Sequence, residues 1–207
     1  MTGPSALAFD TFYHIFNRGN NRENIFIEEP NYSYFMRLYG QYIPPVAETW
    51  AFCCLRNHFH LFVKIRSRSE ISDAMAVFSP EEEHRLLHTP SRHFSNFFNA
   101  YSKAVNRVYH RTGSLFQHPF KRKAVADPRY FRRVITYIHQ NPQRHGLVSD
   151  YREWPFSSFH SYRAKEERPI VGDVIPRFFQ DSKEYRKIHS QKTYPGTILP
   201  LLIDDFS

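Results

Sequence analysis

The stretch Asn57–Ile65, with the sequence NHFHLFVKI, has the pattern of a β-strand with two different faces. Side chains at alternate strand positions point to the same face, so His58 and His60 share one face, about 6.5 Å apart along the chain. The apolar residues between and after them share the other face: Phe59, Leu61 and Val63. The pattern therefore predicts a sheet that buries its core on the apolar face and carries paired imidazoles on the other.

Further elements flank this strand on both sides. Thr49–Leu55 is a second apolar-rich strand, and Arg56-Asn57 marks a hairpin turn between the two. The other elements are predicted at Thr11–Asn17 (strand), Ile25–Ile27 (short strand), Pro30–Ile43 (helix), Arg92–His110 (helix, buried side including Val108, ended by Gly113), Phe120–Ala126 (strand) and a helix that follows Asp127-Pro128 and ends at Asn141-Pro142. The order strand–helix–strand–strand–helix–strand, followed by an extra helix, favours an α+β fold of the ferredoxin-like type. In that fold, helices cover one face of a four-stranded antiparallel sheet.

The chain length and composition fit one folded domain with an appendage. The 207 residues are 41% hydrophobic, which excludes general disorder, and they contain no apolar run long enough to span a membrane. We expect a domain over residues 8–145 and a C-terminal extension over 146–207 that packs on it and contains a helix at Val174–Ser190. Two adjacent cysteines and the lack of a secretory pattern indicate a cytoplasmic protein.

The net charge of +8 is concentrated in one part of the chain. Nine basic residues and one acidic residue, Asp127, lie between Lys103 and Arg133, whereas charges cancel over the rest of the sequence. Such a window is typical of a protein that binds a polyanion, most simply a nucleic acid. The aromatic content of 17% fits stacking on unpaired bases. A solvated basic surface is the alternative interpretation.

The helix after Asp127 carries three groups suited to phosphate chemistry. Tyr137 and Asn141 are four residues apart and so lie one turn above the other, and Arg133 precedes Tyr137 by another turn. A phenol, an amide oxygen and a guanidinium therefore share one side of the helix. The alternative is a packed tyrosine with an asparagine cap, and the histidine pair is equally explained by two buried, hydrogen-bonded side chains. His14, on the first strand, is expected in the core or behind that pair.

Five stretches together resemble a known family. LRNHFHLFVKI, residues 55–65, resembles the HUH motif (His, hydrophobic, His) of single-tyrosine transposases, and YFRRVITYIHQNPQRHGLV, residues 130–148, resembles their catalytic-tyrosine helix. The REP-associated tyrosine transposase branch is further resembled by YHIFNRGNNRENIF (13–26), RTGSLFQHPFKRKAV (111–125) and REWPFSSFHSY (152–162). The resemblance covers roughly residues 10 to 165 in matching order.

The resemblance implies a bacterial enzyme that cuts and rejoins single-stranded DNA bearing a REP-like hairpin. Tyr137 would be the nucleophile that forms a 5′-phosphotyrosine link and leaves a free 3′-hydroxyl, while His58, His60 and Asn141 would bind Mg²⁺ or Mn²⁺. A monomer is favoured over a dimer, and no membrane partner is expected. The candidate DNA-binding residues are Arg18, Arg107, Arg111, Lys121, Arg122, Lys123 and Arg133.

Three other interpretations remain open. The chain would be an inactive single-stranded nucleic-acid-binding module if the tyrosine were only structural, or a metal-dependent phosphodiesterase if water were the nucleophile. A zinc site formed by Cys53, Cys54 and the histidine pair is disfavoured, because adjacent strand residues point to opposite faces.

Overall fold

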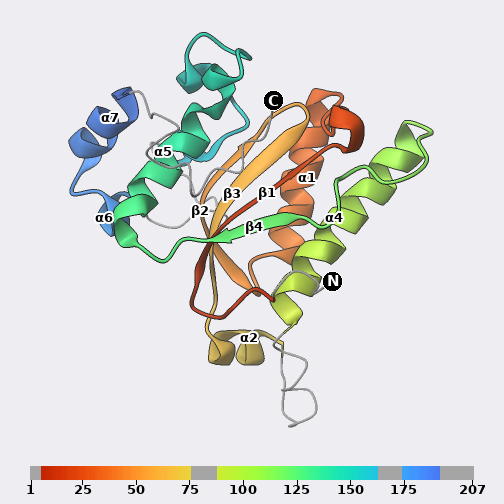
Figure 1. Cartoon of the computed structure of the whole chain (residues 1–207), viewed down its shortest axis with the longest axis horizontal. Helices are drawn as coiled ribbons and strands as arrows, with labels where there is room; N and C mark the ends of the chain where they lie inside the picture. Colours follow the sequence, from red (N-terminus) through yellow and green to blue (C-terminus); the bar gives the residue numbers. More distant parts are fainter. Residues whose placement is uncertain (1–5, 76–87, 163–173, 192–207) are drawn as a thin grey trace.

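The computed structural model describes residues 6–75, 88–162 and 174–191 (Figure 1). Within these ranges the sheet has four strands in the order β2-β3-β1-β4, and each neighbouring pair is antiparallel. The strands are β1 (Phe12–Arg18), β2 (Ala47–Cys54), β3 (His58–Ile65) and β4 (Lys121–Ala124). The α-helices are α1 (Glu29–Tyr42), α2 (Arg68–Ala74), α4 (Thr89–Val108), α5 (Pro128–Arg144), α6 (Val174–Phe178) and α7 (Ser182–Ser190). The chain order and the sheet order confirm the predicted ferredoxin-like arrangement with extra helices.

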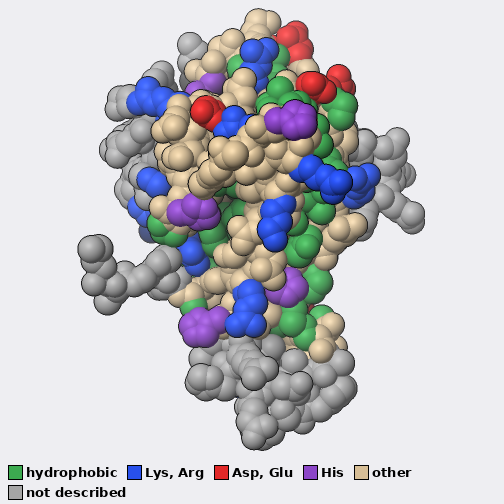
Figure 2. Space-filling model, turned by 90° about the vertical axis from the view of Figure 1, so that its right-hand side faces the viewer, with side chains coloured by type: hydrophobic (Ala, Val, Ile, Leu, Met, Phe, Trp, Pro, Cys, Tyr) green, Lys and Arg blue, Asp and Glu red, His purple; other side chains and the backbone are tan. Residues whose placement is uncertain are grey.

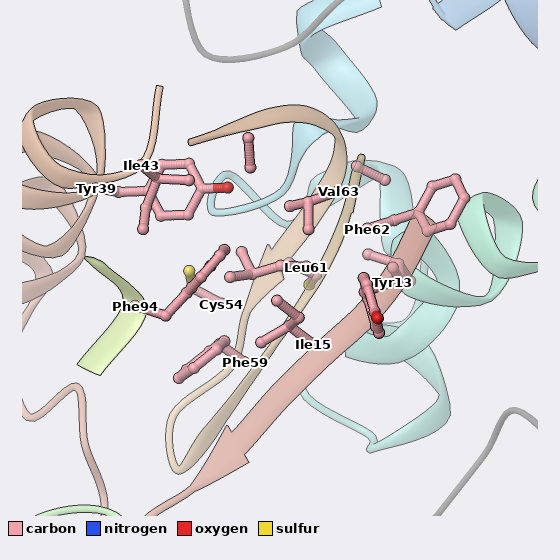
Figure 3. Packing of buried hydrophobic residues seen from close by; sticks show 14 of the residues in the cluster. Tyr13, Ile15, Tyr39, Ile43, Cys54, Phe59, Leu61, Phe62, Val63 and Phe94 are labelled. Carbon is pink, nitrogen blue, oxygen red and sulfur yellow. The ribbon is translucent and has the colours of Figure 1, made fainter. Parts of the chain in front are cut away.

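Helices α1 and α4 lie against one face of the sheet and enclose the core there (Figure 1). The ring of Phe59 on β3 lies 5.3 Å from that of Phe35 on α1 and 5.3 Å from that of Phe98 on α4, between ring centroids. Figure 3 shows Ile15 and Leu61 beside Phe59 in the same layer. The apolar face of β3 is therefore the core face, as its alternation predicts.

Helix α5 covers the opposite face of the sheet, where it contacts β2 and β3 (Figure 1). Its start is the one that the sequence predicts: Pro128 is in the first turn, and the Asp127 carboxylate accepts a hydrogen bond from the Arg129 backbone N–H at 2.9 Å. Phe131 packs on the sheet with its ring 4.3 Å from Phe12 and 5.5 Å from Phe62. The sheet is thus buried on both faces.

The chain after α5 is attached to the outer strand β2. The backbone N–H of Cys54 donates to the carbonyl of Phe156 at 2.9 Å, and the indole N–H of Trp154 donates to the carbonyl of Cys54 at 2.9 Å. This part contains the 3-10 helices η2 (Tyr151–Glu153) and η3 (Ser158–Tyr162). Further along, Arg132 of α5 pairs with Glu184 of α7 at 2.7 Å. The predicted division between residues 145 and 146 stays a prediction.

Two predictions near the core are wrong. Ile25–Ile27 forms no strand; the backbone N–H groups of Ile25 and Phe26 both donate to the carbonyl of Arg56, so these apolar side chains are buried from a loop. Helix α4 ends at Val108, whose 65% exposure contradicts its predicted place on the buried side. Gly113, at φ +81°, lies beyond the helix end rather than at it.

Two helix predictions also differ from the structure at their ends. Helix α5 continues through Pro142 to Arg144. The proline has no N–H to donate to the preceding turn, but the His145 N–H still donates to the Asn141 carbonyl at 2.9 Å and closes the last turn. The predicted helix at Val174–Ser190 is divided into α6 and α7. None of the helices in the described ranges is long and apolar enough to cross a membrane.

Candidate active site

The two histidines of β3 lie on the face covered by α5. Both are buried, and their ring centroids are 5.2 Å apart with the ring planes nearly perpendicular, at 89°. Two imidazoles that bind one ion through nitrogens about 2.1 Å away hold their ring centroids roughly 4.5–5.5 Å apart. The spacing of His58 and His60 therefore fits a shared ion.

Helix α5 brings Tyr137 onto this pair. The Tyr137 ring lies 5.7 Å from the His60 ring and 6.2 Å from the His14 ring, between centroids, and meets both edge to face. One turn later the Asn141 side-chain N–H donates to the Tyr137 carbonyl at 3.2 Å. Tyr137 is only 1% exposed and Asn141 is fully buried. Residues that are 77 and more positions apart in the chain thus meet in one closed site.

Polar atoms of the site are buried without a hydrogen-bond partner in the part of the chain that the structure describes. Nε2 of His60 and Oδ1 of Asn141 are buried and have no hydrogen-bond partner among the described residues. His58 uses its Nδ1 to donate to Oδ1 of Asn57 at 2.7 Å, which leaves Nε2 as its candidate ligand atom. Since burying a polar atom without a partner is unfavourable, such atoms need an explanation. Imidazole nitrogens and amide oxygens are both ligands of divalent cations, so this set of atoms fits a metal site.

Burial keeps both imidazoles neutral. It lowers the pKa of His58 to about 3, with smaller contributions from the charges of His145 and Arg18. It also lowers the pKa of His60 well below the usual value, assisted by His14 and His58. At neutral pH each ring therefore keeps a lone pair for a ligand.

The zinc alternative finds no support in the described residues, where no three His, Cys, Asp or Glu side chains are grouped to hold a metal. In the antiparallel register Cys53 is opposite His60 and Cys54 is opposite Phe59, so the two cysteines lie on opposite faces as expected. Burial raises the pKa of the Cys53 thiol, which disfavours the thiolate that zinc needs.

Two further residues join the site from the end of α5. The Arg144 guanidinium lies 5.2 Å from the centroid of the Tyr137 ring, and the His145 ring lies 4.7 Å from that of His58. The sequence contained a signal for Arg144, since it follows Tyr137 by two helical turns. That signal was hidden because the helix was predicted to end at Asn141-Pro142.

The strand register divides the basic residues between the two faces. Lys121 and Lys123 of β4 are paired with Phe16 and His14, so they lie on the face of the site. Arg18 is paired with His58 on that face. Arg122, between the lysines, points to the other face, where its guanidinium donates to Ser91 of α4 at 3.1 Å. The prediction that the whole basic window borders one site is wrong for Arg122.

Other basic residues of the window lie elsewhere. Arg107 is exposed on α4, which the sheet separates from Tyr137, and Arg111 follows α4 and pairs with Glu23. Figure 2, a view onto the α4 side, shows Lys and Arg side chains scattered along that face and Asp and Glu gathered toward its upper end. Arg133 is exposed on α5, 5.5 Å from the Tyr130 ring. The long helix α4 therefore does not border the site, contrary to the prediction.

Known proteins resemble this chain in sequence. No family model matches it. A Haemophilus influenzae protein assigned as a REP-associated tyrosine transposase is 27% identical over 129 residues, which cover 62% of this chain and 64% of that protein, slightly less than two thirds of its length. The REP-associated tyrosine transposase of Escherichia coli K12 is 28% identical over 119 residues, 56% of this chain and 72% of that protein.

A solved structure shares the fold. It is a REP-associated tyrosine transposase bound to a REP hairpin; it superposes with a TM-score of 0.53 at 20% identity, over 84% of this chain and 92% of the other. The similarity to the two relatives extends over more than half of the chain, and the fold agrees over most of it. In sequence and in fold, the chain is therefore similar to REP-associated tyrosine transposases.

Proposed function

We propose that the chain is a DNA strand transferase that uses Tyr137 to cut and rejoin single-stranded, hairpin-bearing DNA. The observation that carries this proposal is the meeting of Tyr137 and Asn141 on α5 with His58 and His60 on β3. The names of the relatives, and the hairpin bound in the solved neighbour, point to the same substrate class.

The reaction is a balanced transfer at phosphorus. The Tyr137 oxygen forms a bond to the scissile phosphorus, and the bond from phosphorus to the 3′ oxygen breaks. The phenol proton passes to that oxygen, so the products are a 5′-phosphotyrosine link and a free 3′-hydroxyl. Attack by a 3′-hydroxyl later reverses the step. Phenolate is a better leaving group than an alkoxide, so the phosphotyrosine link stays reactive toward a 3′-hydroxyl and the strand can be rejoined.

The remaining residues hold and polarise the reacting groups. His58, His60 and Asn141 would hold Mg²⁺ or Mn²⁺, which, when bound, supplies Lewis-acid polarisation of the phosphate. Arg144 stabilises negative charge on the Tyr137 oxygen, since its guanidinium lies over the ring. Lys121 and Lys123 hold backbone phosphates at the open edge of the sheet.

The burial of Tyr137 has a consequence for the reaction. At 1% exposure, the tyrosine meets no DNA until side chains that cover it move aside. All four central residues come from one chain, so the proposed active form is a monomer. Light scattering with and without a hairpin oligonucleotide tests that form, and a dimer that alone cleaves DNA would contradict it.

A cleavage assay tests the proposal against its alternatives. The protein is incubated with Mn²⁺ and hairpin oligonucleotides labelled at either end, and the products are separated on denaturing gels. We expect a covalent adduct that disappears in Tyr137→Phe and persists in the matched control Tyr130→Phe on the same helix. We expect His60→Ala to abolish cleavage while hairpin binding largely persists. Cleavage that survives Tyr137→Phe would indicate hydrolysis, and binding alone an inactive module.

A further inference from the structure

Another buried histidine, His14, lies directly behind His60. Nε2 of His14 on β1 and Nδ1 of His60 on β3 are 2.9 Å apart, and both side chains are almost completely buried. The register accounts for the contact, because His14 is paired with Phe62, two residues after His60 on the same face. The Phe16 ring lies against both imidazoles, with its centroid 4.9 Å from that of His14 and 5.9 Å from that of His60.

We propose that His14 is a positioning residue that fixes the orientation and tautomer of His60, so that the lone pair of His60 Nε2 faces a divalent cation. This inference rests on the proposed function, because it concerns the cation of that same site. His14 itself touches neither DNA nor the cation; it acts through His60.

The hydrogen bond allows two arrangements of one proton. If His60 donates through Nδ1–H, His14 accepts, and His60 Nε2 carries a lone pair. If His14 donates through Nε2–H, His60 must carry its own proton on Nε2. Nε2 of His60 is buried and has no hydrogen-bond partner among the described residues. A buried N–H there would lack an acceptor, whereas a lone pair there is a ligand for a cation.

The neighbouring atoms favour the lone-pair arrangement. Oδ1 of Asn141, a second acceptor, is also buried and lacks a hydrogen-bond partner among the described residues. No hydrogen bond joins these two atoms, so Asn141 Oδ1 is not the acceptor that a His60 Nε2–H would need. His60 Nε2 and Asn141 Oδ1 would both be satisfied as acceptors by a cation. Metal-binding histidines generally donate their other N–H to a group that holds the ring, which is the role assigned to His14.

The test measures binding of Mn²⁺ alone, without DNA, by the loss of the free-ion electron paramagnetic resonance signal. His14→Phe keeps ring volume but removes the hydrogen bond, and we expect it to raise the Kd for Mn²⁺ by about 10- to 100-fold. His14→Gln offers an amide acceptor and should recover most of the affinity. His93→Phe is the matched control, because that histidine bonds to the Tyr42 carbonyl on the α1/α4 side of the sheet.

A second measurement needs no variant. Long-range ¹H–¹⁵N correlation spectra of the wild-type protein with Mg²⁺ should show His60 protonated on Nδ1. Protonation on Nε2 would overturn the proposal, as would a folded His14→Phe variant with wild-type Mn²⁺ affinity. A purely structural role would lower the melting temperature of His14→Phe and leave the Kd of the folded protein unchanged, which also overturns it.

The outcomes separate this inference from the proposed function. Wild-type protein that forms the Tyr137 adduct while His14→Phe binds Mn²⁺ normally would refute only the role of His14. Mn²⁺ binding that depends on His14 and His60, without any DNA adduct, would support His14 and refute the transferase. Wild-type protein that neither binds Mn²⁺ nor forms an adduct would refute both.

Discussion

Strand β4 offers a sharp test of where DNA binds, because its basic residues alternate between two faces. Lys121 and Lys123 lie on the face of His14 and Phe16, and Arg122 lies on the face of Ile15. The Arg122 guanidinium is also held 4.0 Å from the Phe120 ring centroid and bonds to Ser91. The double change Lys121→Gln and Lys123→Gln should therefore weaken DNA binding, and Arg122→Gln should not.

The expected size of the effect follows from counterion release. Each phosphate contact on a single strand contributes about −0.7 to the slope of log K against log salt concentration. Loss of both lysine contacts should therefore make the slope less steep by about 1.4. Between 50 and 200 mM salt, the affinity of the wild-type protein should consequently fall about sevenfold more than that of the double variant.

Fluorescence anisotropy with a labelled hairpin that carries a single-stranded flank measures these slopes. Arg122→Gln controls for the loss of one positive charge on the same strand, and thermal melting reports whether loss of its bond to Ser91 affects folding. An unchanged slope in the lysine double variant would refute the assignment of this face. An equal change of slope in Arg122→Gln would refute it as well.

Three further predictions concern the core, the pH dependence and the tyrosine. Phe59→Ala should lower the free energy of unfolding by about 3–5 kcal/mol, since the ring is completely buried between α1 and α4; urea denaturation giving a loss below about 1 kcal/mol would contradict this. Burial lowers the pKa of His189 to about 4, so as the pH falls the unfolded chain binds a proton at this residue before the folded chain does. The free energy of unfolding should therefore fall between pH 6.5 and 4, by up to about 1.4 kcal/mol per pH unit from this residue. Denaturation of His189→Gln at pH 7.5 and 5 should show a weaker dependence of stability on pH than the wild type. Arg144→Gln should slow adduct formation at Tyr137 about tenfold or more in single-turnover assays and change hairpin affinity less; equal losses in both would assign Arg144 to binding alone.

Local patterns were enough to predict the faces of the sheet. The alternation from His58 to Leu61 separates polar from apolar positions with a period of two, so the face of each of these side chains follows from chain geometry alone. The start of α5 was equally predictable, because Asp127 and Pro128 act within the first turn. The sequence likewise indicated that Tyr137 and Asn141 share one side of a helix.

The contacts between elements were not predictable in this way. Nothing local to Arg122 reveals that its neighbours face the site while it faces α4, because this depends on the pairing register with β1. The place of Arg144 is hidden in the sequence because Pro142 predicts a helix end, whereas the helix continues past it to Arg144. The strand predicted at Ile25–Ile27 is likewise absent, and Ile25 is buried from a loop instead.

The central claim is that Tyr137 itself forms the covalent link to DNA. The most direct measurement incubates the protein with Mn²⁺ and a hairpin oligonucleotide, trims the bound DNA with nuclease and maps the modified residue by tandem mass spectrometry of the peptides. We expect a nucleotide phosphate on Tyr137 and on no other of the 13 tyrosines. A modification on a different tyrosine, or DNA cleavage with every tyrosine unmodified, would contradict it.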